Sequence, residues 1–112
     1  MQQHLFHSPI PSTFIAVQDG KPVGSVSLIH YRVSREPTRV WLTNLYIEPG
    51  YRQQGKGSAL LDYAELFALR QELSLLYLYT FDSSDFYLER GWEIERVAQL
   101  RNLPIDILHK QL

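Results

Sequence analysis

The first half of the chain repeats short β-prone segments that are separated by turn residues. Residues 13–17 are rich in β-branched and aromatic side chains, and the Asp19-Gly20 pair that follows is a strong turn signal. Along residues 23–31 aliphatic and serine side chains alternate, so that one face of the segment is apolar. These features predict an antiparallel β-hairpin.

The aliphatic side chains of a third expected strand, residues 40–47, change phase within the segment. They occupy even-numbered positions before the Thr43-Asn44 pair and odd-numbered positions after it. One extra residue at this point predicts a β-bulge, which bends a strand and opens a gap beside its neighbour. The pattern equally allows Trp41 or Tyr46 to form the buried face.

The second half of the chain alternates helical and strand patterns. Apolar side chains recur at helical spacing over residues 55–70, and the apolar run at residues 75–79 predicts a buried strand parallel to the third one. A short helix is expected at residues 83–89, and residues 92–100 and 105–112 predict a final hairpin. The element order β-β-β-α-β-α-β-β predicts an α+β fold with a mixed, strongly bent sheet of about six strands, two helices and a splay at the bulged third strand.

Composition narrows the possible functions. With 112 residues, of which 45% are hydrophobic, the chain is expected to form one globular domain over residues 1–112, with residues 1–12 as an irregular lead. A formal net charge of -1 provides no general attraction to nucleic acid or to an anionic membrane, and neither partner is expected. The absence of cysteine excludes disulfides and thiolate metal sites, so we expect no metal and a cytoplasmic localisation.

The loop between the third strand and the first helix has the features of an anion site. Gly55 and Gly57 let a ligand approach the backbone, and the first N–H groups of the helix point outward from its positive end. Arg52 and Lys56 add positive charge beside these groups, and Ser58 adds a hydroxyl donor. Two glycines alone would more simply indicate an ordinary connector. The spacing matches neither the P-loop nor the three-glycine dinucleotide fingerprint, which removes the main support for an ATPase or a dehydrogenase.

Two motifs in this part of the chain carry a family resemblance. Residues 45–61 resemble the acetyl-coenzyme A signature of GCN5-related N-acetyltransferases (GNAT), whose core is Gln/Arg-x-x-Gly-x-Gly/Ala. The fixed positions of that core are occupied by Arg52, Gly55 and Gly57. Residues 85–92 are similar to the second signature of the family, and the resemblance in element order covers about residues 14–112. It implies a GNAT-like fold and an enzyme that moves an acetyl group from acetyl-CoA to a primary amine by direct attack on the thioester.

The resemblance also implies roles for particular residues. The main chain of the bulged strand would hold the pantetheine arm, the loop would hold the diphosphate, and the start of the second helix would complete the site. The implied cofactor-binding residues are Leu45, Tyr46, Ile47, Arg52, Gln53, Gln54, Gly55, Lys56, Gly57, Ser58, Asp82, Ser83 and Phe86. Tyr87 matches the tyrosine that protonates the departing thiolate, although a lone tyrosine is more often a core aromatic residue.

The remaining catalytic groups are less defined. A main-chain N–H freed by the bulge near residues 44–46 is expected to stabilise the oxyanion. Several ionisable side chains could act as the general base, although each is more often a surface charge, a helix cap or a partly buried histidine. These candidates are Glu48, Asp82, Asp85 and His30. A water chain could also deprotonate the amine.

The chain departs from the family at its start. Family members usually begin with a strand and one or two helices, whereas only residues 1–12 precede the first strand expected here. The amine pocket is therefore expected to be open, shortened or completed by another chain, which would suit a protein N-terminus, an exposed lysine or a bulky amine. Exposed sheet edges make a homodimer a possible assembly.

Two other functions remain open from the sequence. The chain could be a catalytically silent CoA-binding or regulatory module with the same cofactor cleft. A nucleic-acid function would rest on Arg32, Arg35 and Arg39, but Glu36 lies among them and a solvated loop explains the group better.

Overall fold

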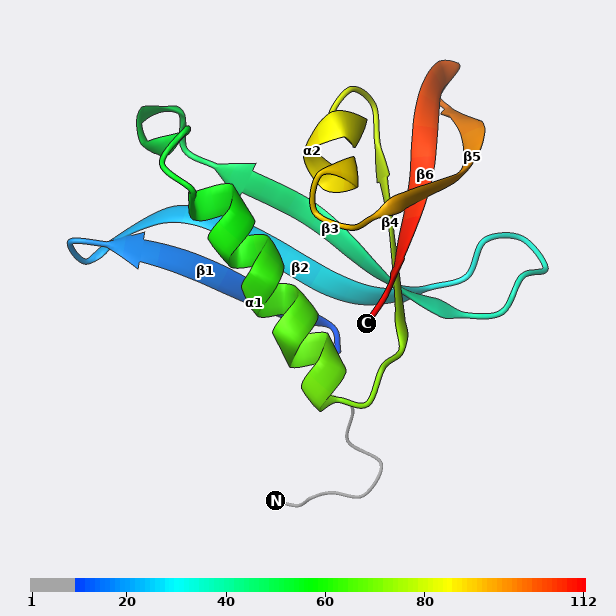
Figure 1. Ribbon diagram of the computed structural model, residues 1–112, viewed down its shortest axis with the longest axis horizontal. Helices are drawn as coiled ribbons and strands as arrows, with labels where there is room; N and C mark the ends of the chain where they lie inside the picture. The colour runs from blue at the N-terminus through cyan, green and yellow to red at the C-terminus, as the bar shows by residue number, and fades with distance from the viewer. Residues whose placement is uncertain (1–9) are drawn as a thin grey trace.

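A computed structural model of the chain, which describes residues 10–112, contains a mixed sheet and two α-helices (Figure 1). The expected element order is confirmed, and a short 3-10 turn, η1, follows the third strand. The elements are β1 (Ser12–Gln18), β2 (Lys21–Tyr31), β3 (Arg39–Ile47), η1 (Pro49–Tyr51), α1 (Lys56–Arg70), β4 (Leu75–Thr80), α2 (Ser84–Leu88), β5 (Glu93–Leu100) and β6 (Leu103–Gln111). Most of the expected irregular lead, residues 1–9, lies outside the described residues.

The sheet has the strand order β1-β2-β3-β4-β6-β5 and is splayed at its centre. β3 and β4 run parallel, as expected for strands joined by a helix, whereas the other neighbours are antiparallel. The register of β3 and β4 contains a single pair, Trp41 with Tyr77. From this point the two strands diverge, with β1, β2 and α1 on one side and β5 and β6 on the other (Figure 1).

The expected bulge in β3 is present. Ser25 pairs with Tyr46 and Ser27 pairs with Thr43, so two residues of β3 lie opposite one residue of β2. The first of these two, Asn44, has φ of 57°, the left-handed conformation that asparagine tolerates better than most residues. The extra residue turns the end of β3 away from β4.

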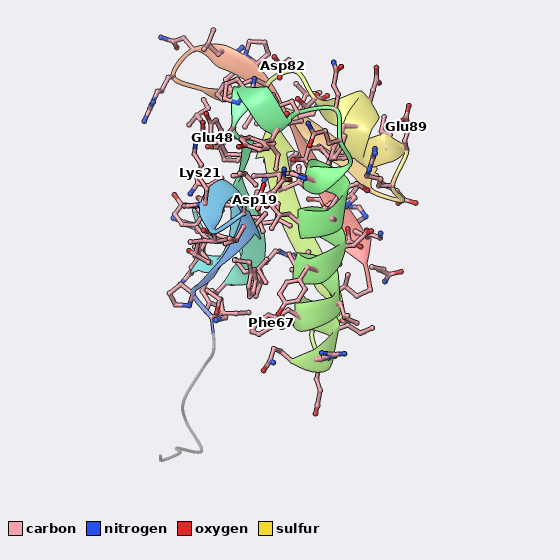
Figure 2. All side chains as sticks on the ribbon, turned by 90° about the vertical axis from the view of Figure 1, so that its left-hand side faces the viewer. Asp19, Lys21, Glu48, Phe67, Asp82 and Glu89 are labelled. Carbon is pink, nitrogen blue, oxygen red and sulfur yellow. The ribbon has the colours of Figure 1, made fainter. Side chains whose placement is uncertain are left out.

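Two hydrophobic clusters pack against opposite faces of the sheet. α1 buries its apolar stripe on β1, β2 and β3, and Figure 2 shows Phe67 between this helix and the sheet. The cluster on this face also contains Leu28, Leu78 and Trp92. The second cluster is formed by Trp41, Tyr77, Ile105 and Ile107 on the other face. Trp41 is therefore buried in this second cluster, whereas Tyr46 is 46% exposed.

The final hairpin differs from the expectation in its turn. The two turn residues are Arg101 and Asn102, both with positive φ (52° and 65°), and Leu103 already pairs with Leu100. The expected start of the last strand at Ile105 is wrong because Pro104 is accommodated near the start of the strand, where it lies opposite Gln99.

No helix within residues 10–112 is long and apolar enough to cross a membrane. The same part of the chain contains no group of three or more histidine, aspartate or glutamate side chains arranged to hold a metal ion.

Candidate active site

The divergence of β3 and β4 creates a cavity of about 660 Å³, which is within the usual range for a small-molecule site. Parallel strands that share one pair and then separate leave a widening gap, and side chains from both line it. The lining residues are Ile29, Tyr31, Val33, Trp41, Leu42, Thr43, Asn44, Leu45, Leu78, Tyr79, Thr80, Phe81, Asp82, Ser83, Tyr87, Arg96, Ala98, Gln99, Leu100, Ile105 and Ile107.

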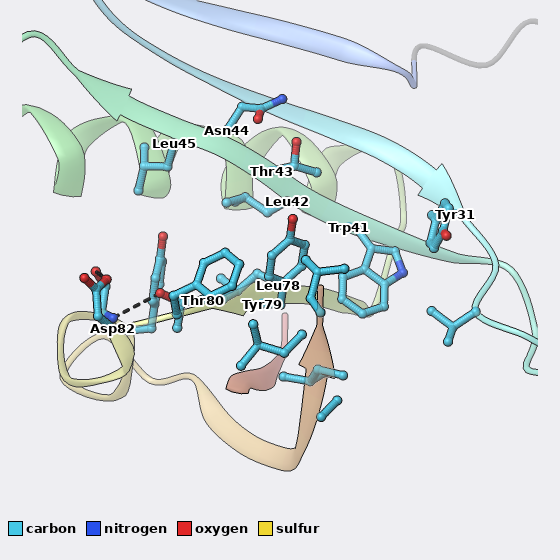
Figure 3. Close-up of a pocket in the computed structure, with 18 of the residues that line it drawn as sticks. Tyr31, Trp41, Leu42, Thr43, Asn44, Leu45, Leu78, Tyr79, Thr80 and Asp82 are labelled. Carbon is cyan, nitrogen blue, oxygen red and sulfur yellow. Dashed lines mark hydrogen bonds between the residues drawn. The ribbon is translucent and has the colours of Figure 1, made fainter. Parts of the chain in front are cut away.

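The cavity connects the two faces of the sheet. Leu78 and Tyr87 belong to the cluster on the α1 face, whereas Trp41 belongs to the cluster on the opposite face, and all three line the cavity. Figure 3 shows Leu45 and Asp82 at one end of the cavity and Trp41 at the other. A molecule bound on one face can therefore contact a molecule bound on the other face.

The loop before α1 presents main-chain donors beside this cavity. Gly55, with φ of 81°, is the N-cap residue, and no side chain among residues 10–112 caps the helix. The N–H groups of residues 56–58 precede the first intrahelical hydrogen bond and are available for an anion. The Arg52 side chain attaches the loop to β3, because its Nε donates to the Ile47 carbonyl oxygen at 2.8 Å.

Helix α2 packs against the start of α1. A Cβ atom built at Gly57 would lie 3.8 Å from Phe86 and 3.8 Å from Ile47, so the glycine is at the meeting point of α1, α2 and β3. The Arg90 guanidinium lies 3.8 Å from the centre of the Phe86 ring, and its Nε donates to the Ser58 hydroxyl at 3.2 Å. Sequence reasoning missed Arg90 because no local pattern marks a contact between residues so far apart in the chain.

Tyr87, on α2, is the candidate proton donor. It is 8% exposed, its ring meets those of Phe86 and Trp92 edge-on, and it lines the cavity. Burial raises the pKa of the Tyr87 hydroxyl above its ordinary value of 10.0. The phenol is therefore protonated at neutral pH and can act as a proton donor.

Of the four candidate general bases, one lines the cavity. Asp82 lines the cavity, where it accepts a hydrogen bond from the Ser83 hydroxyl at 3.1 Å. The Ser83 N–H donates to the Thr80 hydroxyl at 3.0 Å, a bond drawn in Figure 3. The lining does not include Glu48, Asp85 or His30.

The residues implied by the resemblance fall into two adjoining groups. Leu45, Asp82, Ser83 and Tyr87 line the cavity. The residues outside the lining are grouped around the start of α1 and the end of β3, and they are Tyr46, Ile47, Arg52, Gln53, Gln54, Gly55, Lys56, Gly57, Ser58 and Phe86.

Sequence reasoning missed the aromatic residues on the far side of the cavity. Tyr31, Tyr79 and Phe81 line it together with Trp41. Tyr31 and Tyr79 were expected in strands, and Phe81 follows the end of β4. The separation of β3 from β4 decides that all three line a cavity.

The chain belongs to the acetyltransferase (GNAT) family, whose sequence profile matches residues 1–92. No curated protein matched it in sequence. Naa50 of Arabidopsis thaliana, solved with the bisubstrate analogue CoA-Ac-MVNAL, is 22% identical with a TM-score of 0.73, covering 89% of this chain and 72% of that one. An aminoglycoside 6'-N-acetyltransferase complexed with coenzyme A is 19% identical with a TM-score of 0.74, covering 88% of this chain and 71% of that one.

A GNAT-family acetyltransferase of Streptococcus pneumoniae is 24% identical with a TM-score of 0.75, covering 89% of this chain and 65% of that one. The chain also spans only 64% of the first matching structure, from Lactobacillus plantarum. These similarities confirm the GNAT-like fold.

Proposed function

We propose that the protein is an N-acetyltransferase that moves an acetyl group from acetyl-CoA to a primary amine. The observation that carries this proposal is the cavity between β3 and β4, which is lined by Tyr87 from the α1 side and reaches the opposite face. Two substrates can approach one point from opposite faces. Family membership and the neighbours solved with coenzyme A or a bisubstrate analogue support acetyl-CoA as the donor.

The start of α1 would bind the diphosphate of the cofactor. Several convergent main-chain donors and the positive end of a 15-residue helix favour an anion there, and Lys56 adds positive charge. The Ser58 hydroxyl accepts a hydrogen bond from Arg90 and keeps its own O–H as a donor, so this O–H and the Ser58 main-chain N–H would both serve the phosphate. Gln53 and Gln54 lie within the same loop, between η1 and α1.

The end of β3 would bind the pantetheine arm. Beyond Trp41 the β4-facing edge of β3 has no strand partner within residues 10–112. Its main-chain groups at Leu45 and Ile47 can therefore hydrogen-bond the amide groups of the arm. Phe86, Asp82 and Ser83 would border the arm from the α2 side.

The chemistry follows from these positions. The amine nitrogen attacks the acetyl carbonyl carbon, a C–N bond forms, and the C–S bond breaks. The thiolate takes the proton of the Tyr87 phenol, and the proton lost by the attacking nitrogen returns through water to the tyrosinate. The products are the acetylated amine and the CoA thiol. Asp82, which lines the same cavity, would accept the proton of the incoming ammonium group through water.

Calorimetric titration with acetyl-CoA, CoA and ADP tests the cofactor site. We expect micromolar binding of acetyl-CoA, retained in part by ADP because the diphosphate supplies much of the contact. No binding by any of the three would overturn the proposal.

Turnover of Tyr87→Phe tests the catalytic step. We expect this variant to lose roughly a hundredfold in kcat while its acetyl-CoA affinity is kept. Tyr63→Phe, on the exposed side of α1, is the matched control and should keep the wild-type rate. Binding of acetyl-CoA without turnover of any amine would instead support the silent CoA-binding module.

A further inference from the structure

The part of the cavity on the face opposite α1 is apolar and aromatic. Trp41, Ile105 and Ile107 form its floor, and each is at least 93% buried. Its walls are completed by Ile29, Val33, Ala98 and Leu100, which pack against this floor. Together these residues form the distal pocket. Because they lie on the far side of the sheet from the α1 loop, they cannot contact a diphosphate bound at that loop.

Charge is scarce in the cavity. Among the described residues that line it, Asp82 is the single carboxylate and Arg96 the single cation. Arg96 contacts Glu36 at 3.3 Å and Glu95 at 3.9 Å, so its charge is already balanced. Asp82 lies at the cofactor end of the cavity, away from Trp41 (Figure 3). The distal pocket can therefore neutralise no positive charge.

Resting on the proposed acetyl transfer, we propose that the acceptor is a primary amine attached to an aromatic or large aliphatic group. That apolar group occupies the distal pocket on Trp41, while the amine extends toward Tyr87 and Asp82. Burial of the apolar group is favourable, whereas a second or third ammonium group in the distal pocket would lose its hydration without gaining a partner. Polycationic amines are therefore poor acceptors.

This chemistry has two possible sources, which share one recognition mode. The amine is either that of a free arylalkylamine or the α-amino group of a polypeptide that begins with a large apolar residue. A peptide would place its second residue outside the cavity, so the two sources differ in what lies beyond the distal pocket.

Initial rates of CoA release with saturating acetyl-CoA test the proposal. The acceptors are phenylethylamine, short peptides beginning with Phe or with Ser, spermidine and an aminoglycoside. We expect kcat/KM for phenylethylamine or the Phe peptide to exceed that for spermidine and the aminoglycoside by at least about tenfold, as burial of an apolar group predicts. The Phe peptide should exceed the Ser peptide, and the ratio of phenylethylamine to the Phe peptide identifies the source.

Substitutions on β5 give a matched pair of variants. Ala98 lines the distal pocket, whereas its neighbour Val97 is 67% exposed and lies outside the lining. Ala98→Asp should raise the spermidine-to-phenylethylamine ratio of kcat/KM by about tenfold or more by supplying the missing carboxylate. Val97→Asp should leave that ratio within about twofold of wild type. Ala98→Phe, which fills the pocket without adding charge, should lower kcat/KM for phenylethylamine and for the Phe peptide while leaving that for spermidine little changed.

The outcomes separate this inference from the proposed function. Failure to bind acetyl-CoA in the calorimetric titration would overturn the acetyl transfer and the inference with it. Acetyl-CoA binding combined with equal or faster acetylation of spermidine would overturn only the inference. Acetyl-CoA binding without acetylation of any apolar amine would also overturn it.

Discussion

At the scale of single residues, Gly24 allows β2 to approach the end of β3 closely beside the bulge. A Cβ atom at this position would lie 2.6 Å from the Ile47 side chain and 2.9 Å from the Tyr46 carbonyl oxygen. The second contact is with backbone and cannot be relieved by a rotamer change. The glycine therefore helps to set the path of the strand that would hold the pantetheine arm.

Gly24→Ala should lower the free energy of unfolding by about 1–3 kcal/mol, because the added methyl group overpacks this contact. Urea denaturation measures the change. Gly50→Ala is the control, since a Cβ atom there would meet nothing within 4 Å. Equal effects of the two substitutions would contradict the close approach.

Tyr87 makes stability depend on pH in the alkaline range. Burial raises the pKa of Tyr87 in the folded protein, so above the unfolded pKa of about 10 the unfolded chain releases a proton that the folded protein keeps. The free energy of unfolding should therefore fall as the pH rises from about 10 toward the higher folded pKa.

Urea denaturation between pH 9 and pH 11 checks this prediction. We expect the free energy of unfolding to fall less with pH for Tyr87→Phe than for the wild type. Part of the fall should remain, because burial and the Glu95 carboxylate also raise the pKa of Tyr77. An identical fall in both proteins would show that Tyr87 ionises alike in the folded and unfolded states.

At the scale of elements, a negative charge at the start of α1 should have opposite effects on helix stability and on cofactor binding. Gly57 occupies the second position of the helix, and the space around it accepts a Cβ atom at ordinary contact distance. A carboxylate there would favour the positive end of the helix but repel a diphosphate.

We therefore expect Gly57→Asp to weaken acetyl-CoA binding by roughly tenfold or more while the melting temperature changes little. Gly57→Asn, of nearly the same shape but uncharged, should lose less affinity. Calorimetry and thermal unfolding of both variants measure the two effects, and parallel losses of affinity and melting temperature would count against the anion site.

Glu65 connects α1 to the C-terminal half of the sheet. Its side chain is 14% exposed and accepts hydrogen bonds from Trp92 Nε1 at 3.0 Å and from Lys110 Nζ at 2.7 Å. Lys110 also donates to the Arg90 carbonyl oxygen at 2.8 Å. One carboxylate thus holds α1 against β6 and the segment that follows α2.

Glu65→Ala should cost about 1–3 kcal/mol of unfolding free energy, because two partly buried donors lose their acceptor. Asp62→Ala, at an exposed position on the same helix, should cost far less. Chemical denaturation compares the two, and similar small losses would show that water replaces the Glu65 contacts.

At the scale of the whole molecule, β1 forms one edge of the sheet and leaves apolar side chains exposed. Ile15 is 58% exposed and Val17 is 62% exposed. Homodimerisation through this region stays a prediction, which sedimentation velocity over a range of concentrations would test. We expect a concentration-dependent dimer that Ile15→Lys disrupts, whereas Leu66→Lys on the exposed side of α1 does not.

Most elements of the fold could be predicted because their patterns are local. The phase change around Thr43-Asn44 was sufficient to predict the bulge, and the turn at Asp19-Gly20 was recognised from residues that favour positive φ. The sequence places the last turn too late in the chain, because arginine has no preference for the positive φ that Arg101 adopts in the actual turn at Arg101-Asn102.

The sequence by itself determined the strands, the helices, the glycine-rich loop and the family motifs, because short-range patterns along the chain encode each of them. Only the tertiary structure decided that Tyr87 and Trp41 line one cavity that joins the two faces of the sheet. It also brought Arg90 to Ser58. The bulge, a local feature, separates β3 from β4 after their single pair, but the side chains that line the resulting gap come from segments distant in the chain, which only the folded structure brings together.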